Sequence, residues 1–435
     1  MEHIAPSLEF LTSLNGLLGD EISSFMNSYK EPPVKGIRLN ANKQACVSFA
    51  GDINDKQIPW EPAGFYVEDA FIKHNVLAHE AGCFYVQEPS AMAPVAVLSP
   101  KKDELVLDLC AAPGSKATQI AAYLNGTGLL VANEPVPERA RVLSSNLCRM
   151  GVANSIVVSD SPERLALRWP ELFDAVLVDA PCSGEGLFRK QPESRLEWTV
   201  KTPVGCVKRQ KQILTEAIKM LKPGGRLCYS TCTFNTLEND DCCDWLSSTS
   251  KRLTALPFLL PGVGFAQYGR IRLWPHRVRG EGQFIALFTK QEGSIGVTRV
   301  KRRLPVIDLD KLNIPSWINH SNQPCCRWGD LLVTVPDVPP LEGIRVLRVG
   351  LHLAKLSGDV CIPDHAAALA AGIQPDIALT KAEAYRYLAG ETLTGTKRGW
   401  LTVGFMGAAL GWVKGVDGVY KNHYPKHLRR VISDR

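Results

Sequence analysis

The chain has 435 residues, of which 45% are hydrophobic and 22% are charged, and its formal net charge is +6. This length is sufficient for two or three domains with separate cores, and the composition is ordinary for a folded protein in water. No apolar run is long enough to span a bilayer and residues 1–10 lack a signal-peptide pattern, so we expect a cytoplasmic protein without membrane contact.

A regular pattern of strands and helices begins at about residue 103, after a first region of mixed character. Strands are expected at residues 105–109, 128–132, 155–159, 173–178, 227–230 and 283–289, and the intervening helices end near residues 124, 150 and 221. Entirely apolar strands that alternate with helices are typical of a parallel sheet covered on both faces. Residues 96–290 are therefore predicted to form a doubly wound α/β domain.

The C-terminal part has a different pattern. Residues 291–303 are polar and basic and are predicted to be a linker. Short β-like runs punctuated by glycines follow at residues 331–335, 344–347, 400–405 and 409–413, and they predict a separate, mostly β unit. Residues 381–435 hold ten Lys or Arg and four Asp or Glu, whereas the rest of the chain is balanced. This basic excess suits a polyanion such as RNA, although a solvated face without a partner would give the same pattern.

A ligand site is expected where the first strands end, because ligands bind beyond the carboxyl ends of parallel strands. The first strand leads into Cys110-Ala111-Ala112-Pro113-Gly114-Ser115-Lys116, whose small residues let a ligand approach the backbone. The turn has a single glycine and lacks the G-x-G-x-x-G pattern of nicotinamide-binding domains, which disfavours a dehydrogenase. Glu134 and Asp160 follow the next two strands. Each acid alone is more often a helix cap or a surface group, but the three positions together favour an adenosine-containing cofactor.

The 13 cysteines include no C-x-x-C pair, the spacing that anchors most structural zinc sites, so we expect no metal ion. Most are expected to be reduced, buried and inert. Cys182 and Cys232 are the exceptions, because they follow the fourth and fifth strands beside the predicted cofactor site. A thiolate that adds to carbon 6 of a pyrimidine activates carbon 5 toward a sulfonium methyl group. Asp179 could meet the charge that reaches N3, and the second thiol could assist product release.

Three motifs carry a family resemblance: residues 109–116, residues 179–184 and residues 230–234. Together and in this order they resemble the signature motifs of the Nop2/Sun family of RNA (cytosine-5)-methyltransferases. Residues 34–40 and 82–92 resemble N-terminal motifs of that family, so the resemblance covers most of residues 30–290. It implies a Rossmann-like methyltransferase domain at residues 96–290 and an N-terminal RNA-recognition region at residues 1–95.

The resemblance also assigns roles to individual residues. Cys232 matches the family nucleophile, and Cys182 matches the cysteine that releases the product. The residues that match contacts with S-adenosyl-L-methionine are Cys110, Ala111, Ala112, Pro113, Gly114, Ser115, Lys116, Glu134, Asp160 and Asp179.

Residues 399–405, 411–412 and 421–430 resemble the PUA-type RNA-binding tail of the bacterial branch that methylates small-subunit ribosomal RNA. This implies a linker and intermediate α+β region at residues 291–380 and a PUA-like domain at residues 381–435. Residues 350–355 are also similar to that branch, whereas residues 356–358 depart from its basic pattern. The expected RNA contacts are Lys190, which could equally be an exposed loop lysine, and Lys421, Lys426, Arg429 and Arg430 in the tail.

These observations predict a monomeric enzyme that methylates carbon 5 of a cytosine in ribosomal RNA, within an assembled small subunit. A DNA cytosine-5 methyltransferase would share the chemistry, but its nucleophile would be Cys182 and it would have no need of a second thiol. A non-catalytic ribosome-assembly factor would be expected to lack part of the cofactor turn or one of the cysteines, and this chain has both.

Overall fold

The computed structural model of the protein describes residues 7–43, 53, 56–250, 252–291, 304–306, 325–335, 337–357 and 360–430. The linker predicted at residues 291–303 lies almost entirely outside these described residues. Within the described part of the chain, no helix combines the length and the apolar character needed to cross a membrane.

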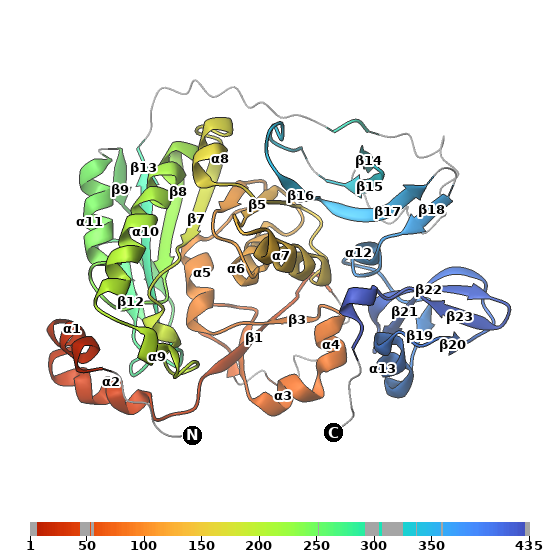
Figure 1. The fold of residues 1–435 in the computed structure, drawn as a ribbon, viewed down its shortest axis with the longest axis horizontal. Helices are drawn as coiled ribbons and strands as arrows, with labels where there is room; N and C mark the ends of the chain where they lie inside the picture. Colours follow the sequence, from red (N-terminus) through yellow and green to blue (C-terminus); the bar gives the residue numbers. More distant parts are fainter. Residues whose placement is uncertain are drawn as a thin grey trace.

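A large mixed sheet forms the centre of the molecule (Figure 1). Its strands follow the order β12-β13-β8-β7-β4-β5-β6-β16, and β9 pairs with β13. Their bounds are β4 Leu105–Asp108, β5 Leu129–Asn133, β6 Ser155–Val158, β7 Phe173–Asp179, β8 Leu221–Thr231, β9 Leu253–Ala255, β12 Arg270–Leu273, β13 Gln283–Lys290 and β16 Val346–Val349. The doubly wound prediction is confirmed, because β4 to β8 are parallel and the strand order reverses at β4.

The sheet differs from the prediction at three places. Strand β13 is antiparallel to β8, so its first residues lie at the carboxyl end of β8. Strand β16 is antiparallel to β6, although its residues were predicted to belong to a separate C-terminal unit. Strand β8 begins at Leu221, earlier than expected, because Leu221 pairs with Phe173 before an irregular stretch that contains Pro223, Gly224 and Gly225.

Helices cover both faces of this sheet, and each face has its own buried core. One face carries α5 (Ala93–Leu98), α6 (Ser115–Leu124) and α7 (Pro137–Arg149). The other carries α8 (Pro162–Arg168), α10 (Lys201–Met220) and α11 (Asp240–Thr249), and α10 and α11 lie in front of β8 and β13 in Figure 1. Local signals set the helix starts: Pro137 and Pro162 occupy first-turn positions, and the Ser161 hydroxyl caps α8.

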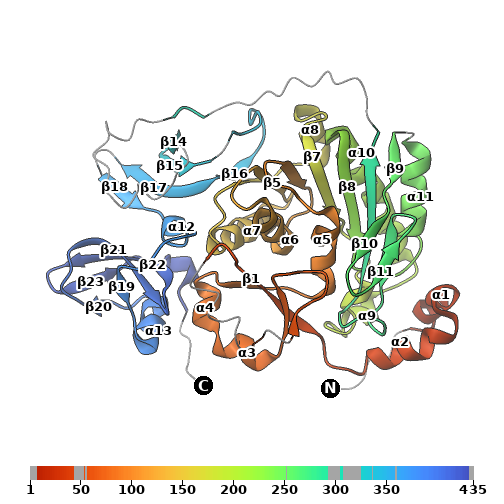
Figure 2. The same ribbon diagram turned by 180° about the vertical axis from the view of Figure 1, so that it is seen from behind.

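The N-terminal region packs against the end of the sheet that carries the site. Helices α1 (Leu8–Leu18) and α2 (Ile22–Ser28) bury Phe10 and Phe25 against Phe188, Trp198 and Phe234. They are followed by a small antiparallel sheet and two short helices, whose bounds are β1 Lys35–Leu39, β2 Gly64–Val67, α3 Asp69–His74, α4 Val76–Glu80 and β3 Phe84–Val86. A short helix α9 (Ser194–Glu197) and a hairpin of β10 (Phe258–Leu260) and β11 (Gly264–Ala266) complete this side (Figure 2).

The C-terminal residues form two further sheets. The first consists of β14 (Cys325–Trp328), β15 (Leu331–Thr334), β17 (Leu351–Ser357) and β18 (Val360–Pro363). Helix α12 (His365–Ala368) leads to the second sheet, which consists of β19 (Ile377–Ala378), β20 (Leu393–Thr394), β21 (Gly399–Phe405), β22 (Ala408–Val416) and β23 (Val419–Asn422). Helix α13 (Lys381–Ala389) lies between β19 and β20 in the chain. This second sheet lies beside α4 (Figure 1), and Tyr387 and Tyr424 share a buried core with Leu77 and Phe84.

Candidate active site

A cavity of about 900 Å³ lies at the carboxyl edge of the central sheet, where β4, β5, β7 and β8 end. Its walls include the turn after β4 and the loops that carry both predicted cysteines. The sequence-predicted residues on its walls are Cys110, Ala112, Pro113, Ser115, Lys116, Glu134, Asp179, Cys182, Lys190 and Cys232. The fold thus gathers residues from four separate strand ends into one site, as expected for an open α/β sheet.

The two cysteines of this cavity are in direct contact. Their Sγ atoms lie 3.3 Å apart. The Gly186 amide donates a hydrogen bond to the Cys232 carbonyl at 2.7 Å, and a Cβ atom at Gly186 would come within 2.8 Å of that oxygen. The hydrogen bond to Cys232 and then burial raise the pKa of the Cys182 thiol well above its ordinary value. Cys182 therefore keeps its proton at neutral pH and can direct it toward the Cys232 sulfur.

Asp179, the last residue of β7, is oriented by three donors. Lys116 Nζ donates to one carboxylate oxygen at 2.7 Å, and the Ser230 hydroxyl and the Gln283 amide donate to the other at 2.7 and 3.1 Å. Burial opposes the charge on Lys116, but the attraction of Asp179 outweighs it and raises the pKa of that ammonium group. The result is a fixed and partly exposed carboxylate on the same cavity wall as the two thiols.

Asp108 lies behind this pair, at the end of β4, and is completely buried. Burial, followed by the negative charge of Asp179, raises the pKa of Asp108 to about 8. Asp108 is therefore mainly neutral at pH 7. The ion pair of Lys116 and Asp179 consequently has no second full negative charge directly behind it.

The turn from Cys110 to Lys116 joins β4 to α6. Gly114 has a φ of 115°, and a Cβ atom there would lie 3.2 Å from Leu143 of α7, so glycine allows close packing behind the turn. Glu134, at the end of β5, accepts hydrogen bonds from the Val136 amide at 3.0 Å and from Arg139 at 3.1 Å. Because the Arg139 side chain is 58% exposed, the buried carboxylate can exchange this partner for ribose hydroxyls. These features fit an adenosine-containing cofactor.

Three of the predicted cofactor contacts do not line the cavity: Ala111, Gly114 and Asp160. The Asp160 carboxylate accepts a hydrogen bond from the Ser161 amide at 3.0 Å and pairs with Arg164 at 2.9 Å. The neighbouring residues Pro162 and Glu163 line the cavity at this point instead. Glu134 thus lines the cavity with the other site residues, and the role of Asp160 as a cofactor contact stays a prediction.

The predicted RNA contacts lie in two places. Lys190 is exposed on the cavity wall, together with Arg209. Lys421 and Lys426 are exposed in the tail, whereas Arg430 is paired with Glu80 of α4 and Arg429 donates to the Tyr424 carbonyl at 3.2 Å. The two arginines thus hold the tail in place, whereas the predicted RNA contacts of the two exposed lysines stay a prediction.

The sequence prediction missed two segments of the cavity wall: residues 85–88, at and after the end of β3, and residues 281–283, which lead into β13. Gln283 orients Asp179, and the buried Glu281 pairs with Arg189 at 2.8 Å, next to Lys190. A usable signal was the polar Glu281-Gly282-Gln283 stretch before an apolar strand. If that strand is antiparallel to its neighbour, its beginning must lie at the edge where the parallel strands end.

Comparisons with known proteins identify the family. Residues 95–289 match the model of the 16S rRNA methyltransferase RsmB/F, residues 7–89 match the N-terminal domain of the 16S rRNA methyltransferase RsmF, and residues 374–430 match the PUA domain of the methyltransferase RsmF. The ribosomal RNA small subunit methyltransferase F of Shewanella loihica is 34% identical to this chain, in an alignment that covers 97% of this chain and 95% of the relative. The chain belongs to the RsmB/F methyltransferase family. The enzyme of the same name from Vibrio parahaemolyticus is 32% identical, with 97% of both chains covered.

Solved structures resemble about two thirds of this RsmB/F family member. A methyltransferase homologue from Pyrococcus horikoshii is 28% identical, with a TM-score of 0.54 over 65% of this chain and 99% of that chain. NSun6 from the same organism is 22% identical, with a TM-score of 0.57 over 66% of this chain and 99% of that chain, a likeness that shows the fold alone. The family models and the curated relatives confirm the predicted methyltransferase activity and PUA-like C-terminal region, and the solved structures agree with the Rossmann-like fold.

Proposed function

We propose that this methyltransferase transfers a methyl group from S-adenosylmethionine to carbon 5 of a cytosine in small-subunit ribosomal RNA, with Cys232 as the nucleophile. One observation carries the proposal: two thiols in contact at 3.3 Å share a cavity with the fixed carboxylate of Asp179. A single thiol would be sufficient for attack on a pyrimidine. The second is placed to act on the sulfur of the first, which suits a separate release step.

The cofactor would be held by the turn from Cys110 to Lys116 and by Glu134, whose carboxylate would accept the ribose hydroxyl hydrogens. When bound, it supplies an electrophilic methyl group to the cavity. Asp179, Cys182 and Cys232 lie at or just after the carboxyl ends of β7 and β8, on the walls of the same cavity. The RNA base would therefore contact them there.

Cys232, Asp179 and Cys182 act at different steps of the proposed reaction. The Cys232 thiolate adds to carbon 6 of the cytosine, and the electron pair of the ring double bond makes carbon 5 nucleophilic. Asp179 is placed to meet the charge that develops on N3: it would take up a proton from solvent when the base binds, give it to N3 as charge develops, and take it back when the adduct collapses. After methyl transfer, carbon 5 loses its proton to water, the bond from carbon 6 to Cys232 breaks, and Cys182 gives its proton to the departing sulfur. Cys182 then regains a proton from solvent, and Cys232 loses its proton to solvent before the next cycle.

The RNA would enter past the exposed Lys190 and Arg209, and the tail would add Lys421 and Lys426 as phosphate contacts. Ribosomal RNA is the substrate class because the relatives from Shewanella and Vibrio are named ribosomal RNA small subunit methyltransferases and align with nearly the whole chain. The family-matched N-terminal and PUA regions flank the cavity-bearing domain, which suits a folded RNA substrate rather than a free nucleotide.

Substitution of each cysteine tests the mechanism. We predict that Cys232→Ala abolishes methyl transfer to background and forms no covalent protein–RNA complex, because the only route to the activated ring is lost. We predict that Cys182→Ala still permits attack and transfer but accumulates a denaturant-stable complex, because the Cys232 adduct is not released. The measurement is a denaturing gel of each variant with labelled RNA and S-adenosylmethionine.

The same gel tests the alternatives. A nucleophilic Cys182, as in a DNA cytosine-5 methyltransferase, would reverse the two phenotypes, and a complex in Cys232→Ala would reject our assignment. Two inert thiols would leave turnover unchanged apart from effects on folding. The buried Cys83, which lies outside the cavity, offers a matched control, since Cys83→Ala should change stability without trapping RNA.

A further inference from the structure

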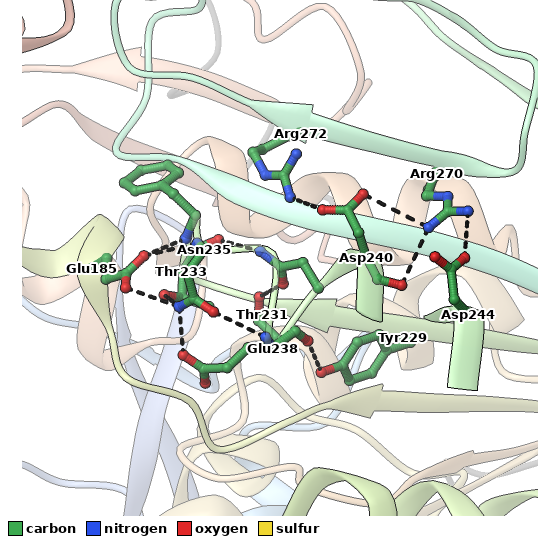
Figure 3. A network of polar contacts seen from close by, with 12 residues as sticks. Glu185, Tyr229, Thr231, Thr233, Asn235, Glu238, Asp240, Asp244, Arg270 and Arg272 are labelled. Atoms are coloured by element: carbon green, nitrogen blue, oxygen red, sulfur yellow. Dashed lines mark hydrogen bonds and ion pairs between the residues drawn. The ribbon is translucent and has the colours of Figure 1, made fainter. Parts of the chain in front are cut away.

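Two buried carboxylates lie directly behind the catalytic thiols, and each belongs to the loop of one thiol while binding the loop of the other. Glu185 follows Cys182 in the loop after β7, and Glu238 follows Cys232 in the loop after β8. Both side chains are inaccessible to solvent. Figure 3 shows both carboxylates pointing toward the Asn235 side chain, with Glu185 on the left in that view.

Glu238 binds Ser183, the residue next to Cys182. One of its oxygens accepts hydrogen bonds from the Ser183 hydroxyl and from the Asn235 amide, the latter at 2.8 Å. The other accepts from the Ser183 backbone amide at 3.0 Å and from the Gln210 side chain at 2.8 Å. Ser183 is thereby fixed by both its backbone and its side chain, and Cys182 is bonded directly to it.

Glu185 makes the reciprocal contacts with the loop of Cys232. One of its oxygens accepts from the backbone amides of Phe234 and Asn235 at 2.7 and 3.0 Å. The other accepts from the Asn235 side chain at 2.9 Å and from the Trp198 indole at 3.2 Å. Asn235 donates to both carboxylates, so that it joins the two halves of the arrangement (Figure 3).

We propose that Glu185 and Glu238 are positioning residues that set the placement of the two thiols, Glu185 for Cys232 and Glu238 for Cys182. This inference rests on the proposed function, because it assigns each carboxylate to one step of the two-thiol reaction. The geometry is reciprocal: a shift of either loop breaks hydrogen bonds that originate on the other. The 3.3 Å contact between the sulfur atoms is thus maintained from behind by side chains that do not line the cavity.

The chemistry of the partners explains why both residues are carboxylates. Each of the four bonded groups around either side chain is a neutral donor, and a carboxylate is the side chain that accepts on both oxygens. A glutamine of the same shape would present an NH₂ group to donors on one side and leave them unpaired. Burial raises the pKa of the Glu238 carboxyl, so that holding a carboxylate among neutral donors is costly compared with apolar packing. Such local costs are typical of functional sites.

The experiment compares Glu238→Gln, Glu185→Gln and the control Glu104→Gln. Glu104 is also a partly buried carboxylate, and it accepts two hydrogen bonds from Arg226 and one from the Lys101 amide, but it lies before β4 at the opposite edge of the sheet. For each protein we measure the unfolding temperature, the turnover per folded molecule, the KM for S-adenosylmethionine, and the fraction of enzyme trapped on labelled RNA in a denaturing gel.

We expect both site variants to lose turnover on the order of 100-fold, the effect of an ångström-scale misplacement of a reacting group, with the cofactor KM unchanged. They should differ in the trapped fraction. Glu238→Gln misplaces Cys182 and should accumulate the covalent complex, whereas Glu185→Gln misplaces Cys232 and should form it slowly. Glu104→Gln should lower only the unfolding temperature.

Normal turnover per folded molecule in either site variant overturns the inference, and so does a loss of turnover with the same trapped fraction in both. Cys182→Ala separates this inference from the proposed function. If Cys182→Ala accumulates the complex and Glu238→Gln does not, the positioning role fails alone. If Cys182→Ala does not accumulate it, the two-thiol mechanism fails, and the positioning roles fail with it.

Discussion

At the scale of single residues, the candidate site depends on which charges are fixed and which partners can be exchanged. The pair of Lys116 and Asp179 is fixed, since Ser230 and Gln283 complete the shell of Asp179 and the buried Asp108 is mainly neutral. The bond from Arg139 to Glu134 is exchangeable, because the arginine is largely exposed and the carboxylate is buried. A ligand can therefore compete for Glu134 more readily than for Asp179.

This difference gives a prediction for cofactor binding. Glu134→Ala should weaken the binding of S-adenosylmethionine by about 1.5–3 kcal/mol, the range for hydrogen bonds to a charged group. The control is Glu138→Ala, which removes a carboxylate that is 74% exposed and pairs with Arg141 at the surface. Titration calorimetry measures both variants. Equal affinity of Glu134→Ala and Glu138→Ala would exclude Glu134 as a ribose contact.

At the scale of elements, the sequence predicted what is local and missed what depends on long-range pairing. The strands from residue 105 to residue 230 were predictable because they are short apolar runs between helices, and the thiols after the fourth and fifth strands followed from the rule that parallel strands end together. The membership of β16 in the central sheet was not predictable, since its partner β6 is far away in the chain. Nor was the role of Glu185 and Glu238, which look like ordinary loop acids until the two loops meet.

The short helix α12, between the two C-terminal sheets, has a titratable group in its packing. His365, its first residue, lies edge-on against Tyr424 at 5.3 Å. Burial, and then the positive charges of Lys43 and His427, lower the pKa of His365 to about 4. The folded state therefore favours the neutral ring, whereas an unfolded histidine has a pKa near 6.5. Stability from this group is present above about pH 6.5 and is lost as the pH falls toward 4.

We accordingly expect His365→Asn to lose less stability than the unsubstituted protein between pH 7 and pH 4.5, with a difference of about 2–3 kcal/mol. Urea unfolding at both pH values measures it. The exposed His74 supplies the control, because His74→Asn should follow the unsubstituted protein. If the stability of His365→Asn and of His74→Asn depended on pH in the same way, protonation of His365 would not limit the stability of the protein in acid.

At the scale of the whole molecule, the N-terminal and C-terminal regions are joined to each other as well as to the sheet. Tyr387 and Tyr424 complete the core around Leu77 and Phe84, and Arg430 pairs with Glu80. The excess of basic residues at 381–435, noted from the sequence, is therefore carried by a firmly attached unit. Removal of the residues after 380 would also expose buried side chains of the N-terminal region. Truncation could therefore weaken RNA binding through a loss of folding, which makes it a poor test of direct RNA contacts.

Substitution of the exposed tail lysines avoids this difficulty. If Lys421 and Lys426 contact phosphates, the variant with both changed to Gln should bind RNA more weakly, and the slope of log affinity against log salt should become shallower by about 1.4–1.8. Binding of S-adenosylmethionine should not change, because neither lysine lines the cavity. Filter binding over a salt series measures the slope. Lys101 and Lys102 are exposed and precede β4, at the edge of the central sheet opposite the cavity. Changing both to Gln gives a control with the same change in net charge. A loss of slope shared equally by the two double variants would mean that RNA responds to the overall charge of the protein and not to its tail.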